Sequence, residues 1–220
     1  MATSGTTAFD LDFAEIAEEA WERAGKEMRT GYDLRTARRS MNLMLLEWQN
    51  RGVNLWCIDE GSLPLVSGTA TYALPLDTVD ILEGILTTGS SDIPLTRLSF
   101  TNFANIPTKT TPGRPVNMYV DRGVGAPTVT LWPVPDTATM SFKYWRLRRM
   151  EDAGSGSSNP DVNIRFYPAL VSGLAYHLAM KTPSLSDRLP LLQAEAEKQY
   201  QLASYEDRDR SHFRVVPRMF

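Results

Sequence analysis

The sequence is poor in the residue types on which metal and thiol chemistry depend. It has one cysteine, Cys57, and two histidines, His177 and His212, among 220 residues. A single cysteine cannot form an intrachain disulfide, and these three residues make no convincing set of ligands for a transition metal. Because Cys57 falls in a segment rich in β-forming residues, we expect a small buried hydrophobe there. We therefore expect no metal and no cofactor.

Catalytic groupings are scarce as well. His177 lies in the most apolar segment, and Ser172, five residues earlier, points elsewhere on a helix, so the two do not form a nucleophile and base. The adjacent carboxylates Asp59–Glu60 and Glu151–Asp152 lack the apolar pocket that would raise one pKa, as a glycosidase acid requires. The glutamates of the first helix spread around a solvated face. We expect no catalytic residue and no enzyme.

Long apolar runs and surplus positive charge are also missing. The longest mostly apolar run, residues 168–180, is too short to span a bilayer, and residues 1–12 have neither the basic start nor the apolar core of a signal peptide. The formal net charge of −3 argues against a protein that grips nucleic acid by neutralising phosphates. We expect a soluble intracellular protein without a membrane partner.

We expect the rest of the chain to be arranged around the stretch from residue 33 to residue 56. Its apolar residues recur at helical spacing, which predicts an amphipathic helix with Asp33 capping its start and Gly52 in a left-handed conformation at its end. Residues 53–58 are rich in β-formers, so we expect a strand almost directly after the helix.

Three further helices follow from the same reasoning. The first covers residues 10–29, is ended by Gly31 and forms an antiparallel hairpin with the helix after it. The third, residues 165–180, is apolar on nearly every side and belongs in the middle of a bundle or between subunits. The fourth covers residues 186–206.

The section between the helical pairs has short β-rich segments divided by Gly, Pro, Asn and Asp. Ser99 is placed to cap a helical turn over residues 100–104, and the prolines of residues 106–115 predict an irregular loop. The strands are expected at residues 55–58, 62–66, 71–74, 79–86, 93–98, 116–120, 128–132 and 139–150.

The predicted fold is α+β: a four-helix bundle of two N-terminal and two C-terminal helices, with an inserted, mainly antiparallel β section and an extended C-terminal tail. The expected divisions are the N-terminal hairpin (1–54), the β section (55–150), a linker (151–163), the C-terminal helices (164–206) and the tail (207–220). The tail is rich in arginine, and we expect it to order only against a partner.

Residues 143–149 mix lysine and arginine with aromatics, as single-strand binders do. On a strand these charges divide between the two faces, so they cannot form one continuous surface for the phosphates of a nucleic acid. We therefore favour an intersubunit or edge-strand role. Arg35, Arg38 and Arg39 could likewise indicate a surface that binds nucleic acid. A solvated helix face, or ion pairs to a neighbour's acidic first helix, is the better interpretation.

Five phrases, in this order and spacing, resemble the head-to-tail adaptor family of short-tailed bacteriophages, also called tail tubular or head-completion proteins. They are TARRSMNLMLLEWQNRGVNLW, TYALPLDTVDILEGIL, PLTRLSFTNFANIPTKTTPGRPVNMYVDR, LWPVPD and YWRLRRMEDAG, and the resemblance runs from about Thr36 to Arg210. It implies a virion structural protein, assembled in the host cytoplasm, that forms a ring of about twelve copies under the portal. Such a ring extends the DNA channel, retains packaged DNA and presents a platform for the tail nozzle. Two alternatives are a tail-associated cell-wall hydrolase and an independent DNA-binding protein.

The resemblance also implies partners for particular segments. The portal protein, the nozzle protein and further copies of the chain are the expected protein partners, and double-stranded DNA passes through without sequence-specific binding. The residues expected to contact the portal are Arg208, Arg210, Phe213, Arg214, Val215, Val216, Pro217 and Phe220. Those expected at a subunit or nozzle interface are Arg35, Arg38, Arg39, Phe103, Lys109, Arg114, Trp132, Trp145, Arg146 and Arg148.

Overall fold

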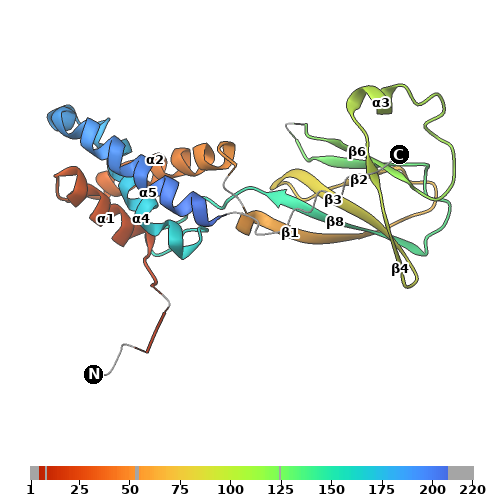
Figure 1. The fold of residues 1–220 in the computed structure, drawn as a ribbon, viewed down its shortest axis with the longest axis horizontal. Coiled ribbons are helices and arrows are strands. Elements are labelled where there is room, and N and C mark those ends of the chain that lie inside the picture. The colour runs from red at the N-terminus through yellow and green to blue at the C-terminus, as the bar shows by residue number, and fades with distance from the viewer. Residues whose placement is uncertain (1–4, 8, 53–54, 124, 208–220) are drawn as a thin grey trace, which may run out of the picture. The chain divides into compact units, whose positions relative to one another are not determined.

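A computed structural model describes residues 5–7, 9–52, 55–123 and 125–207 of the chain (Figure 1). The chain divides into two compact units. A helical unit combines the residues up to Trp56 with those from Met150 onward, and a β unit comprises Cys57–Arg149. The predicted α+β fold is confirmed at this level, because four main helices pack together and two four-stranded sheets are inserted between them in the sequence.

Helix α1 (Phe13–Ala24) is shorter at both ends than the helix predicted over residues 10–29. The Asp12 carboxylate accepts from the Glu15 amide, and the Glu15 side chain accepts from the Asp12 amide, which forms a capping box. Gly25, with φ of 97°, ends the helix in the left-handed region. The prediction that Gly31 ends it was therefore wrong.

Helix α2 (Gly31–Asn50) begins before Asp33. Thr30 is the N-cap, and Asp33 occupies the third helical position, from which its carboxylate accepts from the Thr30 amide. The two residues form a second capping box, so the predicted role of Asp33 as the cap was wrong by three residues. Gly52, with φ of 84°, confirms the predicted left-handed end.

Helix α4 (Tyr167–Ala179) is the centre of the helical unit. It is buried along most of its length, as its sequence predicts, and the other three main helices pack on it. The apolar faces of α1 and α2 meet mainly α4, and the two helices also contact each other. Helix α5 (Leu189–Glu206) completes the group, and short 3-10 turns, Ile164–Phe166 and Pro183–Arg188, precede α4 and α5.

The segment 151–163 connects the β unit to α4 and also packs on the first two helices. The Ala153 amide donates to the Asn42 side chain, and the amide of Phe13 donates to the Ser158 carbonyl. The side chain of Ala153 is buried. This Gly/Ser-rich stretch therefore supplies partners for the start of α1.

The expected strand at residues 55–58 is instead a 3-10 turn, Leu55–Cys57, and the first strand starts at Ile58. Tertiary packing explains the difference. The Trp56 indole donates to the Asp161 carbonyl, and its ring lies 5.0 Å from that of Phe166, so this aromatic residue belongs to the helical unit. Cys57 is fully buried, as expected.

The β unit has two four-stranded sheets, and only β5 and β6 pair in parallel. The mainly antiparallel section predicted from the sequence is confirmed. One sheet has the order β1 (Ile58–Pro64), β8 (Met140–Arg148), β3 (Thr78–Thr88) and β4 (Ser91–Pro94). The other has the order β2 (Thr71–Ala73), β7 (Thr128–Trp132), β6 (Asn117–Asp121) and β5 (Thr96–Arg97).

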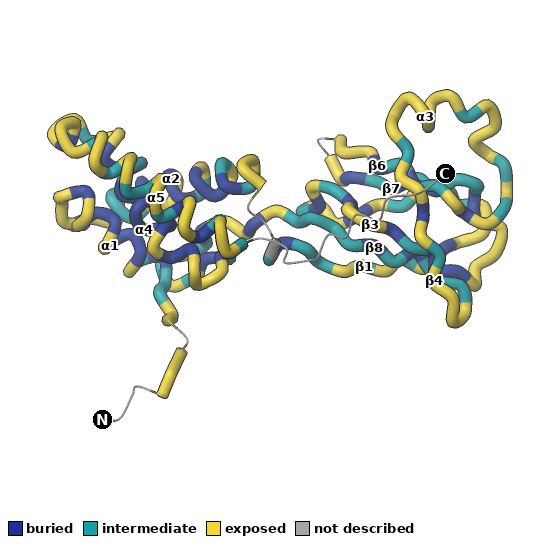
Figure 2. Tube along the Cα trace, viewed as in Figure 1, coloured by how far each residue is buried: buried dark blue, intermediate teal, exposed yellow. Residues whose placement is uncertain are grey.

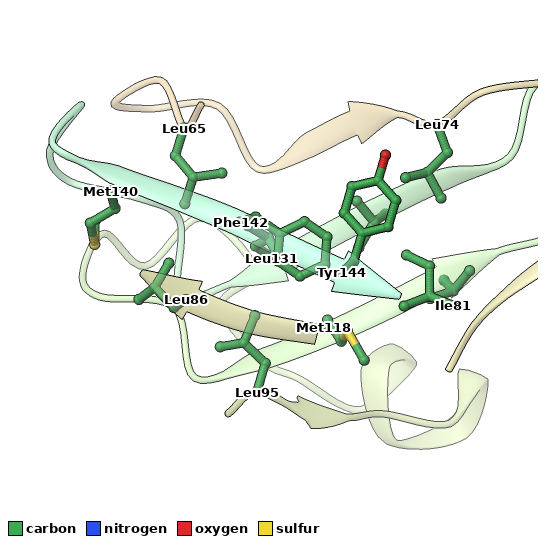
Figure 3. Packing of buried hydrophobic residues seen from close by; sticks show 12 residues of the cluster. Leu65, Leu74, Ile81, Leu86, Leu95, Met118, Leu131, Met140, Phe142 and Tyr144 are labelled. Atoms are coloured by element: carbon green, nitrogen blue, oxygen red, sulfur yellow. The ribbon is translucent and has the colours of Figure 1, made fainter. Parts of the chain in front are cut away.

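Residues from both sheets meet in one apolar core (Figure 3). Phe142 and Tyr144 of β8 stack with ring centroids 5.3 Å apart. Glycine stands opposite Tyr144 on both neighbouring strands, at Gly61 and Gly84. A Cβ at Gly61 would lie 2.4 Å from the Tyr144 ring, so the absence of a side chain there makes room for the aromatic residue.

Candidate interaction surfaces

A groove on the outer face of the β2-β7-β6-β5 sheet brings three of the expected interface residues together. Phe103 belongs to the short helix α3 (Phe100–Ala104), which Ser99 caps as the sequence predicts. Its ring stacks on Tyr119 of β6, with centroids 4.5 Å apart and an interplanar angle of 5°. Because Met118 and Val120 point into the core, Tyr119 must face outward.

Lys109 and Trp132 hold the loop that borders this groove. The Lys109 ammonium donates to the carbonyls of Ala104 and Ile106 at 3.0 and 3.1 Å, and it lies 5.5 Å from the centroid of the Phe103 ring. The Trp132 indole donates to the Thr108 carbonyl at 3.1 Å. The proline-rich loop is therefore tied to both α3 and β7.

The resulting groove encloses about 610 Å³ and combines aromatic rings with hydroxyl groups, the Lys109 ammonium and the Asp121 carboxylate. Thr71 and Thr130 form its floor beside Tyr119, and their hydroxyls are 3.0 Å apart. Sequence reasoning missed these three residues, although the alternation along β6 could have identified Tyr119. Phe100 is 71% exposed and its ring centroid lies 6.4 Å from that of Tyr119, so aromatic surface extends beyond the groove. Figure 2 shows that the trace of α3 is largely exposed.

Aromatic side chains with a polar border are typical of surfaces that bind other proteins. Arg114, another expected interface residue, is exposed in the same loop. The structure thus places Phe103, Lys109, Arg114 and Trp132 in one region of the β unit.

The arginines of β8 lie in a different setting. Arg146 donates to the carboxylates of Asp77 and Asp59, at 2.6 and 3.3 Å, and Arg148 approaches Asp59 at 3.3 Å. The hydrogen bond from Arg146 holds the pKa of Asp77 below its usual value, and the same bond raises the pKa of Arg146. Trp145 faces the other side of the strand, opposite Glu60 on β1 and Glu83 on β3.

The three expected arginines of α2 are all exposed. Arg38 donates to the Gly154 carbonyl at 3.2 Å and Arg39 to the Thr36 hydroxyl at 3.3 Å. None of the three forms an ion pair with a carboxylate of residues 5–7, 9–52, 55–123 or 125–207. The expected portal-contacting residues, from Arg208 to Phe220, lie outside the described residues.

His177 is the described histidine. It lies 3.9 Å from Glu47, and burial lowers its pKa. Ser172 donates to the Pro168 carbonyl and accepts from Arg23, so its hydroxyl is directed to other partners. In the part of the chain that the structure describes, no three histidine, cysteine or acidic side chains gather as metal ligands. In that same part, no helix is long and apolar enough to cross a bilayer.

The fold combines a helical unit with a β unit whose surface carries an aromatic groove. The chain belongs to the SU10 adaptor protein family, whose model matches residues 11–218. This family comprises phage head-to-tail adaptors, and the match covers both units. No curated protein matched the chain.

Proposed function

We propose that this chain joins the head of a phage particle to its tail by forming a ring of about twelve copies beneath the portal. The ring extends the DNA channel, retains packaged DNA and presents a platform for the tail nozzle. The observation that supports this proposal is the match to the adaptor family over residues 11–218. The single most direct test is the mass of the particle formed when the chain is mixed with the portal protein of its phage.

The C-terminal residues are proposed to bind the portal. Residues 208–220 contain four arginines together with Phe213, Val215, Val216 and Phe220, a composition suited to a mixed polar and apolar cleft. Ordering such a segment costs conformational entropy, which only a finished docking site offsets. A chain that ends at Glu206 keeps all four main helices and should fold normally, yet fail to capture portal rings. Unchanged capture would remove this assignment.

The aromatic groove of the β unit is proposed to contact the nozzle or an adjacent copy. Phe103, Lys109, Arg114 and Trp132 supply the aromatic and cationic groups that dominate the energetics of protein interfaces. Trp145 is proposed as a second contact, on the outer face of the other sheet. Arg146 and Arg148 would act there by fixing β8 through their aspartate partners.

DNA is proposed to slide through the ring without being gripped. A subunit of net charge −3 repels phosphate, and each phosphate contact would steepen the salt dependence of binding by roughly one logarithmic unit. A filter-binding titration of the purified chain at low and moderate salt should therefore detect only weak retention of double-stranded DNA. Tight, steeply salt-dependent retention would contradict this part of the proposal.

A further inference from the structure

We propose that a basic groove in the helical unit binds the acidic face of α1 from a neighbouring copy of this chain. The inference rests on the proposed ring, and it names the surfaces through which adjacent subunits would meet. The basic groove is the hollow of about 500 Å³ lined by Trp21, Lys26, Tyr32, Arg39, Leu43 and Lys181. The acidic face consists of Glu15, Glu18 and Glu22 of α1.

Three cations and one carboxylate line the groove, so it carries a net positive charge. Lys26, Arg39 and Lys181 come from three separate parts of the sequence, and none forms an ion pair within the described residues. The Lys181 ammonium donates to the Ser40 hydroxyl at 2.7 Å, which fixes its position. Asp33 is the one carboxylate among the lining residues, and the capping box already occupies it.

Trp21, one of the lining residues, also has a buried donor without an acceptor. The side chain of Trp21 is 3% exposed, and its indole N–H has no hydrogen-bond partner among the described residues. A buried N–H left unpaired is destabilising, so such groups normally have partners. The three cations that line the groove, rather than this donor, indicate a carboxylate-bearing ligand.

The groove has apolar anchors as well. Tyr32 is 63% exposed and Leu43 is 64% exposed, and both belong to α2, on the same side as Arg39. Tyrosine and arginine are enriched among residues that dominate the affinity of protein interfaces. This combination suits a segment of protein better than a free anion.

The acidic face of α1 matches these requirements. Glu15, Glu18 and Glu22 are exposed and follow helical spacing, so they lie along one side of α1. The carboxylates of Glu18 and Glu22 have no ion-pair partner within the described residues, whereas Glu19 is paired with Arg23. One chain therefore carries a basic groove and a separate acidic face on the same unit.

Two different complementary surfaces on one chain make a heterologous contact. Such head-to-tail contacts produce a ring when the rotation between copies closes. The groove of each subunit would then receive α1 from the next, and every copy would use both surfaces. This arrangement is the one that a ring of identical adaptors requires.

Charge reversal tests the contact in the full chain. The first variant carries Lys26→Glu and Arg39→Glu, and the second carries Glu18→Lys and Glu22→Lys. Each alone places like charges across the contact, so we expect complete rings on the portal to require on the order of tenfold more protein. An equimolar mixture restores opposite charges at every contact and should restore rings at the wild-type concentration, as measured by particle mass.

The matched control carries Glu151→Lys and Asp136→Lys, which change the net charge as much as the second variant does at exposed positions outside both surfaces. It should assemble like wild type. Normal assembly of both reversal variants, or failure of their mixture, would overturn the inference while leaving the proposed function intact. Failure of the wild-type chain to form any ring on the portal would instead contradict the proposed function.

Disulfide trapping identifies the occupant directly. In a Cys57→Ala background, a chain with Leu43→Cys is mixed with a chain with Glu22→Cys in the presence of the portal. A covalent dimer in the mixture, and none with either chain alone, is the expected result. Absence of that dimer within assembled rings would exclude α1 of a neighbour as the ligand of the groove.

Discussion

The guanidinium of Arg146 and the carboxylate of Asp77 are joined by a 2.6 Å hydrogen bond across 69 positions of sequence. Arg146 also donates to the Thr78 hydroxyl at 3.0 Å and reaches Asp59 on β1. The arginine therefore ties both strands that flank β8 and the turn before β3. Its side chain is only 13% exposed, so water cannot easily replace these partners.

Replacing this arginine should weaken the β unit. Arg146→Ala leaves two aspartates without their shared donor, and we expect the free energy of unfolding to fall by about 1–3 kcal/mol. A urea titration followed by tryptophan fluorescence measures the change. Arg149→Ala removes an exposed arginine from the same run and should change stability by no more than about 0.5 kcal/mol. Equal effects of the two substitutions would contradict the specific role of Arg146.

The same pair gives a dependence of stability on pH. The hydrogen bond from Arg146 lowers the pKa of Asp77 in the folded chain, so the unfolded chain binds a proton at Asp77 more readily. The stabilisation is present above the ordinary aspartate pKa of about 3.9 and is lost as the pH falls through the lower folded value. Because Asp77 is partly exposed, solvent screening keeps the contribution modest.

We therefore expect Asp77→Asn to be less stable than wild type at pH 7, with the difference shrinking as the pH falls below about 4. Urea titrations at a series of pH values would show this convergence. A constant gap between wild type and Asp77→Asn would rule out a titrating contribution from Asp77.

Gly84 tests how closely the β core is packed. A Cβ at this position would lie 2.6 Å from the Met118 sulfur and 2.8 Å from the Phe142 ring, so neighbouring side chains must move. Gly84→Ala should therefore lower the free energy of unfolding by about 1–3 kcal/mol. At Gly125 a Cβ meets open space, and Gly125→Ala serves as the control. Thermal unfolding of both variants distinguishes overpacking from a general effect of replacing glycine.

The aromatic groove should affect binding more than stability. Phe103→Ala removes the stack on Tyr119, worth about 0.5–1.5 kcal/mol beyond its area, from a half-exposed position. We expect a small loss of thermal stability and a loss of at least about tenfold in affinity for the nozzle protein of the same phage. Phe100→Ala, at the edge of the same surface, is a comparison of similar size. If Phe103→Ala captured the nozzle protein as well as wild type does, the nozzle contact would have to lie outside the aromatic groove.

The sequence predicted the elements better than their ends. Hydrophobic periodicity located all four main helices, because each must bury an apolar face. At the start of α2, however, two residues were candidates for the N-cap. Thr30 and Asp33 each have a side chain that can accept from backbone amides. In the structure both do so in one reciprocal box. A rule that assigns one capping residue to each helix could not decide between Thr30 and Asp33, and so could not fix the first residue of α2.

Interactions between distant segments were beyond sequence reasoning. The composition of residues 143–149 indicated a basic surface, yet Asp59 on β1 and Asp77 in the turn before β3 neutralise two of its arginines. Phe103, Lys109 and Trp132 were chosen as exposed aromatic and cationic residues, and their meeting around Tyr119 depends on how α3 folds over β6. Local spacing contains no information about such a meeting.

The helical unit is made from two stretches of chain separated by the whole β unit, and its central helix α4 comes from the second stretch. On the ribosome, residues 57–149 leave the exit tunnel before Tyr167–Ala179 does. The sheets can therefore fold while α1 and α2 still lack the helix that covers their apolar stripes. A nascent polypeptide stalled shortly after Met150 presents those stripes to chaperones, and only translation through α4 withdraws them.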